Sequence, residues 1–473
     1  MRLLVMWAIV LIPYTIFGVY TGDKYWSPSN VIAFAVTGAV LVHLFAYQRK
    51  LAWEVVWWHK YFLMFLVVGL GSTITSPYFT PALARAIFQF TGIVNMLGLC
   101  IALASEVRRD PEFLARLTKC TMIGLGIVAV LGIIQFVTFN ALHTDAGFSQ
   151  LLIFNDIAHG YVYKLPSELG SILRPNSICR EPSHLAQFLG MGAGLSLLRL
   201  GVLGRIMQEG LRKAVPKWTA VATLVCFTLT VSVIAYLLLA MILVSLIAVS
   251  RRFNPAFLVK ILVYLVFAGA MISAMAFFAG PKFTSKVSSL RLFFTEINPD
   301  DTKDEYVSAL AITANIDVMV KNLKARPLMG VGFGAHPLSY IEKAPLYIRR
   351  PDTFRINSAD AGGLIFRLLS ETGLAGTFCY VAGMLAVCLR ARRLVITAKA
   401  KRSDTVPLVT GYAAAFIGIA IIFFFRWGSY YDVELWTLMA ILACAPMLFQ
   451  PGQARIPVSE PMAPQPVNAL GLA

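Results

Sequence analysis

Residues 281–360 read PKFTSKVSSLRLFFTEINPDDTKDEYVSALAITANIDVMVKNLKARPLMGVGFGAHPLSYIEKAPLYIRRPDTFRINSAD. This is a long polar insertion in a chain that otherwise consists mostly of apolar runs. It is long enough to fold by itself. Its histidine and arginines are His336, Arg291, Arg326, Arg349, Arg350 and Arg355. Chemistry is therefore expected in this segment, and the apolar runs around it are expected to decide the fold.

The composition of the chain is that of a membrane protein. Its 473 residues are 58% hydrophobic and 14% charged, and the mean hydropathy is +0.72. These values exclude the soluble globular class. The net charge of +17 would indicate nucleic acid in a soluble protein, but here much of it is expected to anchor loops in the cytoplasm. No nucleic-acid partner is expected.

The cysteines indicate neither a metal site nor a disulfide framework. They are scattered without metal-ligand spacing, and all but Cys179 fall in or beside apolar runs. The seven are Cys100, Cys120, Cys179, Cys226, Cys379, Cys388 and Cys444. The sequence predicts no metal and no cofactor.

Apolar runs approach the roughly 20 helical residues that are needed to cross a bilayer. They are residues 3–20, 31–47, 61–76, 83–105, 118–139, 182–200, 218–230, 232–249, 256–279, 362–389, 406–425 and 435–449. The stretch 218–249 is too long for one span, so we interpret it as a helical pair that is broken near Thr230 and Ser232. The predicted fold is an all-α polytopic membrane protein with about twelve transmembrane helices.

Lysine and arginine in the short loops predict the orientation, because cytoplasmic loops are rich in these residues. Cation-rich loops alternate with poor ones such as residues 21–30, which carry only Lys24. Both termini are then cytoplasmic. The expected division is residues 1–139 with helices 1–5, 140–181 as an extracytoplasmic loop, 182–279 with helices 6–9, 280–361 as the large extracytoplasmic loop, 362–449 with helices 10–12, and 450–473 as a disordered cytoplasmic tail.

The large outer segment contains a helical pattern between Val307 and Val318, with acidic residues before it and basic residues after it. That charge order suits the helix dipole. Its apolar part is too short to span, so we expect the helix to lie on the membrane surface or to cap a cavity.

A run of three glycines, Gly330, Gly332 and Gly334, follows this helix and predicts a flexible turn that leads to His336. The run is weak evidence for phosphate binding, because the sequence predicts no preceding strand and no helix that opens from it.

A second group of polar residues lies in LRPNSICREPSHLAQFL, residues 173–189, where an outer loop is expected to re-enter the membrane. It contains Arg174, Arg180, Glu181 and His184, and Pro182 suits the first turn of the following helix. These residues either cap a helix among lipid headgroups or grip a diphosphate, because guanidinium groups match phosphate oxygens.

Five short stretches carry a resemblance to a known family. They are REPS at 180–183, LTVSVIAYLLLA at 229–240, RPLMGVGFG at 326–334, NSADAGGLIFRLLSETGLAG at 357–376 and RWGSYYDVELW at 426–436. In their order and predicted topology, residues 173–436 resemble the superfamily of O-antigen polymerases and O-antigen ligases. The resemblance implies a C-type glycosyltransferase fold that acts at the periplasmic face on an undecaprenyl-diphosphate-linked glycan.

The chain departs from the ligase pattern before its Glu-x-Gly element. Ligases of this superfamily have a His-Asn pair before a Glu-x-Gly element, and here Glu371 and Gly373 supply that element while Gly362 and Gly363 occupy the place of the pair. His336 could replace the histidine or could be structural. The departure favours the polymerase branch.

A diphosphate is already a good leaving group, so charge stabilisation is expected to carry most of the catalysis. The candidate catalytic residues are Arg180, Glu181, His336 and Asp360, and the candidate substrate-binding residues are Arg174, Arg291, Arg355 and Arg426. Arg426 could instead snorkel to the headgroups. Arg367 and Glu371, four residues apart on a helix, could pair with each other or act in function.

The function expected from these features is polymerisation of lipid-linked repeat units into O-antigen or exopolysaccharide at the inner membrane. The alternatives are an O-antigen ligase, a flippase or transporter of lipid-linked oligosaccharide, and a structural scaffold. A transporter predicts internal repeats and charged or discontinuous helices near the midplane, whereas no repeat is evident here and the charges gather in the outer segments. The expected partners are undecaprenyl-diphosphate-linked glycans, with a chain-length regulator and a flippase as candidate neighbours in the membrane.

Overall fold

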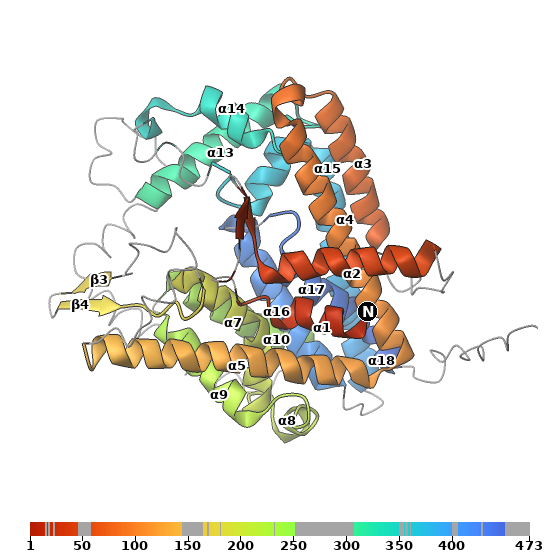
Figure 1. The fold of residues 1–473 in the computed structure, drawn as a ribbon, viewed down its shortest axis with the longest axis vertical. Helices are drawn as coiled ribbons and strands as arrows, with labels where there is room; N and C mark the ends of the chain where they lie inside the picture. The colour runs from red at the N-terminus through yellow and green to blue at the C-terminus, as the bar shows by residue number, and fades with distance from the viewer. Residues whose placement is uncertain are drawn as a thin grey trace, which may run out of the picture.

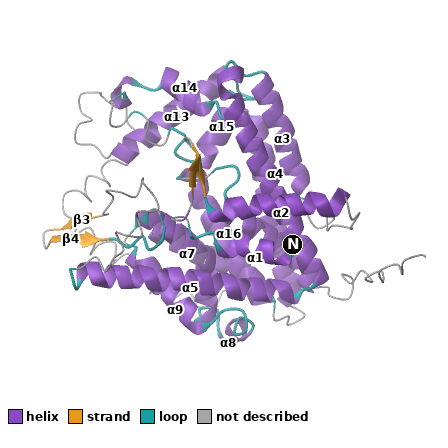
Figure 2. Ribbon diagram, viewed as in Figure 1, coloured by secondary structure: helices purple, strands orange, loops and turns teal. Residues whose placement is uncertain are grey.

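The structure is a computed structural model. It describes residues 1–14, 17, 19–21, 24–45, 58–143, 164–167, 170–179, 181–230, 232–250, 307–349, 354, 358–359, 361–399, 405–426 and 429–449. The predicted span 256–279 and the predicted tail 450–473 lie outside these residues. The described chain is almost entirely helical, with two short pairs of strands (Figure 1, Figure 2).

Several helices are long and apolar enough to cross a membrane. Among the described residues five meet both criteria: α2 (Pro28–Phe45), α4 (Phe79–Arg109), α5 (Glu112–Asn140), α15 (Leu364–Lys399) and α16 (Val406–Phe425). Shorter apolar helices are α3 (His59–Ile74), α9 (Lys217–Leu229), α10 (Val233–Ser250) and α17 (Val433–Ala443). The described residues therefore confirm a helical protein with several helices that are long and apolar enough to cross a membrane, while the predicted number of about twelve spans stays a prediction.

The remaining elements are shorter or less apolar. The helices are α1 (Arg2–Val10), α7 (Pro182–Arg199), α8 (Arg205–Glu209), α13 (Val307–Ala325), α14 (His336–Lys343), the 3-10 helix η6 (Leu346–Ile348) and α18 (Ala445–Phe449). The strands β1 (Val19–Thr21) and β2 (Lys24–Trp26) form one antiparallel hairpin, and β3 (Lys164–Ser167) and β4 (Gly170–Leu173) form another. Strands β2, β3 and β4 fall in segments that the sequence predicts as loops, whereas β1 begins inside the predicted span 3–20.

Two predicted spans differ from the structure. Residues 3–20 do not form one helix, because α1 ends at Val10 and strand β1 begins at Val19. Pro13 lies between them, and its ring and missing N–H are incompatible with a helix interior. The predicted span 435–449 is divided into α17 and α18 by a turn at Cys444.

Other predicted boundaries are confirmed. The pair expected across residues 218–249 is present as α9 and α10, and the break between them falls at Thr230 to Ser232. Helix α16 has the predicted bounds, and α13 includes the predicted helix of the outer segment. Pro182 is the first residue of α7, as its fixed φ favours.

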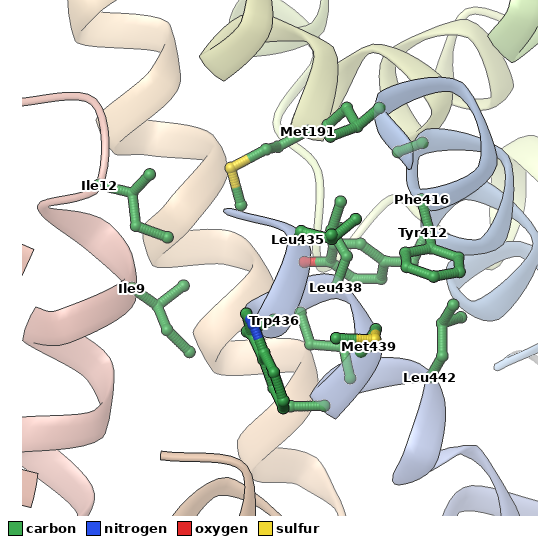
Figure 3. Close-up of a cluster of buried hydrophobic side chains, with 14 of the residues drawn as sticks. Ile9, Ile12, Met191, Tyr412, Phe416, Leu435, Trp436, Leu438, Met439 and Leu442 are labelled. Carbon is green, nitrogen blue, oxygen red and sulfur yellow. The ribbon is translucent and has the colours of Figure 1, made fainter. Parts of the chain in front are cut away.

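Helix α17 lies in the middle of the hydrophobic core. Figure 3 shows its apolar side chains, among them Leu435, Trp436 and Leu438, between Ile9 of α1 and Met191 of α7. Because all eleven residues of α17 are buried, the helix joins the bundle of α5, α7, α9, α10 and α16 to the group formed by α3, α4 and α15.

Small residues allow the closest helix contacts. A Cβ on Gly194 of α7 would lie 2.4 Å from the carbonyl oxygen of Gly411 on α16, so the two backbones touch there. On the other side, α3 packs along α15, and α13 and α14 cover the end of α15 near Leu364 (Figure 1). This end is the one that the loop charges predict to face outward, and it holds the candidate site.

Candidate functional site

The candidate site begins with a break in α15 at Gly373, where φ is 62° and ψ is −160°. In a continuous helix, the amides of Leu374 and Ala375 would donate to carbonyls one turn earlier in α15. Instead, Leu374 donates to the carbonyl of Pro327 over 2.9 Å, and Ala375 donates to that of Leu328 over 3.2 Å. The segment before the glycine run therefore takes the place of a helical turn.

The carbonyls that the break releases are taken by the glycine run itself. Val331 donates its amide hydrogen to the Ser370 carbonyl over 2.9 Å, and Gly332 donates to the Glu371 carbonyl over 2.9 Å. The Ser72 hydroxyl of α3 donates to the same Glu371 carbonyl over 2.7 Å. All four backbone groups at the break are thus satisfied by residues that are distant in sequence.

Three glycines of this run have positive φ, with values of 64° at Gly330, 105° at Gly332 and 70° at Gly334. A Cβ on Gly330 would lie 2.6 Å from backbone atoms of Ser370 and Glu371. The predicted flexible turn is therefore a tightly packed one. The expectation that no helix opens from the run is wrong, because α14 begins at His336.

A buried ionic cluster lies beside the break. Arg367 Nε is 3.5 Å from Oε2 of Glu371, and the Tyr430 hydroxyl donates to the same oxygen over 2.9 Å. The Arg367 guanidinium also lies over the Tyr430 ring, 4.7 Å from its centroid. In the orientation that satisfies both of its ends, the Gln89 amide donates to Glu371 over 3.1 Å and accepts from Gly334 and Arg367.

This cluster carries no net charge, and α15, α4 and the segment before α17 each contribute to it. The sequence-based hypothesis that Arg367 and Glu371 pair with each other is confirmed. Oε1 of Glu371 is buried without a hydrogen-bond partner among the described residues. Because Arg367 and Oε2 are engaged with neighbours, the cluster is suited to fixing the segment that carries Tyr430 rather than to gripping a charged ligand.

His336 lies in a second buried network, above the break. Its Nε2 is 2.9 Å from Oδ1 of Asn315, and its Nδ1 is 2.8 Å from Oγ of Ser370. Asn315 donates its own amide hydrogen to the Ala311 carbonyl, so its Oδ1 accepts from His336. Asn322 donates to Ser370 over 2.8 Å, which leaves the serine proton for Nδ1. These directions assign a neutral imidazole with its proton on Nε2.

The electrostatic surroundings agree with a neutral imidazole. Burial, with a smaller effect from the Arg367 charge, lowers the pKa of His336 to about 3. The network continues through Asn322, which accepts from Ser339 over 2.7 Å and from Lys343 over 2.9 Å. A histidine with both ring nitrogens engaged cannot accept a substrate proton without losing a bond, so the structure favours the structural reading of this residue.

Arg174 and Glu181 lie in the loop that is predicted to re-enter the membrane. Arg174 Nε donates to the Thr230 carbonyl over 3.2 Å, at the break between α9 and α10. Glu181 is the residue before α7 and accepts a hydrogen bond from the Ser183 hydroxyl over 3.0 Å.

Gln135 of α5 holds the same loop. Its side-chain oxygen accepts from the amides of Asn176 and Ser177 over 2.9 and 2.7 Å, and its nitrogen donates to Oδ1 of Asn176 over 2.8 Å. All three residues are buried. The loop is therefore held against α5, five residues before the end of that helix at Asn140.

Arg426 is the residue at the end of α16, and it is half-buried. The segment that follows it carries Tyr430, whose hydroxyl donates to Glu371 of α15. Glu434, at the start of α17, accepts a hydrogen bond from Gln187 of α7 over 3.4 Å. The chain after Arg426 therefore contacts both α15 and α7. The other candidates, Arg180, Asp360, Arg291 and Arg355, lie outside the described residues and stay predictions.

Several polar residues of this region were not predicted from the sequence. Arg85 and Gln89 stand four residues apart inside the predicted span 83–105, and polar residues within a span are functional candidates by default. That spacing could have identified both residues as candidates. No pattern in the sequence distinguishes Asn315 and Asn322, because asparagines on a surface helix are common.

Comparison of the chain with protein-family models and with curated proteins finds no match.

Proposed function

We propose that the protein is a membrane glycosyltransferase that polymerises undecaprenyl-diphosphate-linked oligosaccharide repeat units into O-antigen or exopolysaccharide. In this proposal the chain crosses the bacterial inner membrane about twelve times, both termini are cytoplasmic, and the reaction takes place at the periplasmic face. A chain-length regulator and a flippase are the proposed neighbours in the same membrane.

The observation that carries the proposal is that three stretches on which the family resemblance rests meet in space. RPLMGVGFG exchanges backbone hydrogen bonds with SETG across Gly330 and Gly373. Tyr430 of RWGSYYDVELW donates to Glu371 of the same SETG. Because these stretches are far apart in the sequence but contact one another in the fold, their contact supports the proposal that they form one site.

The proposed reaction joins two sugars without an oxidant or a metal. The oxygen of an acceptor hydroxyl bonds to the anomeric carbon of the donor, and the bond from that carbon to the diphosphate oxygen breaks. The diphosphate leaves with the bonding electrons, and a base takes the hydroxyl proton. Arg174, Arg180 and Arg426 are the proposed phosphate ligands, and Glu181 and Asp360 are the proposed bases.

The buried cluster has a positioning role in this proposal. Arg367 and Glu371 hold Tyr430, Gln89 holds Arg367 and Glu371, and the chain between Arg426 and Tyr430 is short. The cluster thus fixes the place at which the Arg426 guanidinium can meet a lipid phosphate. It also fixes the first turns of α15, which Asp360 precedes in the chain.

A ligase is the second candidate, and the histidine argues against it. The residues in the place of the ligase His-Asn pair are Gly362 and Gly363. His336, the remaining histidine of the outer segment, has both ring nitrogens engaged. A polymerase must hold two lipid diphosphates, one on the growing chain and one on the acceptor unit, which suits arginines divided between two outer loops.

A deletion strain tests the proposal. Cells that lack the protein are expected to keep making single repeat units, whether these stay on the lipid or are transferred singly to their final carrier, and to make no long chains. Full-length polymer that accumulates on the lipid carrier, unattached to lipopolysaccharide, would establish the ligase instead. The readout is the chain-length distribution of lipid-linked and carrier-linked glycan, with the complemented strain as control.

A further inference from the structure

Arg85 stands on the apolar outer surface of α4, inside a helix long and apolar enough to cross the membrane. It is exposed, and so are Leu83 and Ile87 on either side of it, at 39% and 57%. Arg85 lies six positions after the start of α4 at Phe79, which corresponds to about 9 Å along the helix axis. The residue therefore lies among side chains that face lipid, close to one end of the span.

Within the described part of the chain, no hydrogen bond, ion pair or ring contact involves the Arg85 side chain. The neighbouring arginines differ. Arg326 donates to the carbonyl and hydroxyl oxygens of Thr75, and Arg367 is paired with Glu371. Arg85 is thus a positive charge in an apolar surface, and no group of the described residues neutralises it.

The Cβ end of the Arg85 side chain is held next to the buried cluster. A Cβ on Gly334 would lie 2.5 Å from the Cβ of Arg85, so the glycine run packs directly against this turn of α4. One turn further along α4, Gln89 contacts Arg367 and Glu371. Two successive turns of α4 therefore present an exposed guanidinium toward lipid and a neutral polar cluster toward the protein interior.

A charged arginine within a span is costly unless an anion meets it. The anion available at the edge of a bilayer is a lipid phosphate, and the planar guanidinium can bind phosphate oxygens in a bidentate way. A lone arginine can also reach the headgroups by snorkelling along its own stem. Arg85 differs from such a snorkelling arginine because the glycine run packs closely against its Cβ and limits the directions that the side chain can take.

We propose that Arg85 binds the phosphate of a lipid that approaches the protein sideways from the outer leaflet, between the glycine run and the lipid-facing side of α4. The identity of that lipid as the polyprenyl diphosphate of the substrate rests on the proposed function. The residue then receives the headgroup outside the cluster, before the sugar reaches the reacting groups. It binds the lipid and takes no part in the proton transfer.

Lipid binding to the full-length protein tests this role without any glycan. Wild type, Arg85→Gln, Arg85→Lys and the matched control Lys324→Gln are purified in detergent and titrated with undecaprenyl diphosphate and, separately, with phosphatidylglycerol. Lys324 is an exposed cation of α13 outside any candidate span. Native mass spectrometry counts the bound lipid, and size-exclusion chromatography checks that each variant is folded.

The expected result is a loss of undecaprenyl diphosphate affinity of about tenfold or more in Arg85→Gln, a smaller loss in Arg85→Lys, and no change in Lys324→Gln. A loss restricted to the diphosphate identifies the polyprenyl lipid. An equal loss of phosphatidylglycerol supports the phosphate site and identifies the source as headgroups in general.

Unchanged binding of both lipids in Arg85→Gln would overturn the inference and leave snorkelling as the role of the residue. The deletion strain remains an independent test, because it reads chain length and does not depend on Arg85. Failure of one experiment therefore leaves the other interpretable.

Discussion

Gly373 and Gly330 pack backbone against backbone, so that a Cβ on Gly373 would lie 2.8 Å from the amide nitrogen of Gly330. The contact joins a break in a long apolar helix to a loop that precedes α14. Four backbone hydrogen bonds accompany it, two in each direction. The loop is therefore a built part of α15, and the residues around it are held in fixed positions.

Gly373→Ala is expected to destabilise the protein strongly. With φ 62° and ψ −160°, Gly373 lies in a backbone region that almost only glycine adopts, which costs an alanine on the order of 1–3 kcal/mol, and overpacking costs roughly 1–3 kcal/mol more. Gly38→Ala is the matched control, because nothing lies within 4 Å of a Cβ there. Thermal unfolding in detergent measures both. Equal stability of the two variants would mean that the loop and α15 do not meet as described.

The Arg367 and Glu371 pair is expected to show strong coupling. Removing one partner leaves a buried charge, which costs roughly 3–5 kcal/mol, so Arg367→Met and Glu371→Met should each destabilise the protein strongly. The double variant should lose less stability than the sum of the two single losses. The exposed pair Lys321 and Asp317, with side chains 47% and 39% exposed, is the control, and its coupling should stay below about 1 kcal/mol. Similar coupling energies for both pairs would argue against burial of the cluster.

His336 predicts a loss of stability in acid. Its pKa is lowered by burial and by Arg367 from 6.5 to about 3, so the unfolded chain takes up a proton first as the pH falls. The contribution of the neutral imidazole is complete above pH 6.5 and declines toward pH 3, by about 1.4 kcal/mol for each pH unit. Unfolding of wild type and His336→Gln at pH 7.5 and 5 measures it. The advantage of wild type should shrink at pH 5, and a constant difference would contradict a buried neutral histidine.

The orientation of the helices can be tested with reporters that are active only in the periplasm. Fusions after Ile297 or Ser167 should be active, and fusions after Lys213 or Lys399 should be inactive, because cationic loops stay in the cytoplasm. An enzymatic assay on whole cells reads the result. An active fusion after Lys399 would reverse the predicted orientation and would place the candidate site on the cytoplasmic side.

Hydropathy predicted those helices that are uniform apolar runs. Helix α16 was predicted at its observed bounds, because charged or polar residues flank an uninterrupted run. The span over residues 3–20 failed, because its composition is apolar but Pro13 prevents a helix at that point. Hydropathy counts residues over a window and does not register a single missing N–H.

The site was predictable only where its partners are close in sequence. The pairing of Arg367 with Glu371 follows from a spacing of four residues on one helix. Tyr430 is 59 residues away from Glu371 in the sequence and Gln89 is farther still, so no local sequence pattern predicts that they contact its carboxylate. His336 likewise finds Asn315 and Ser370 at separations of 21 and 34 residues. Its surroundings, and hence its neutral state, come from the tertiary fold.

The central claim is that this protein lengthens glycan chains on a lipid diphosphate, and reconstitution tests it most directly. Lipid-linked repeat units are extracted from the deletion strain and mixed in lipid vesicles with the purified full-length protein. Electrophoresis then resolves the products by chain length. We predict a ladder of lipid-linked products that differ by one repeat unit, with release of undecaprenyl diphosphate. Lipid-linked units that stay single in the presence of folded protein, but move onto added lipopolysaccharide core, would contradict the account.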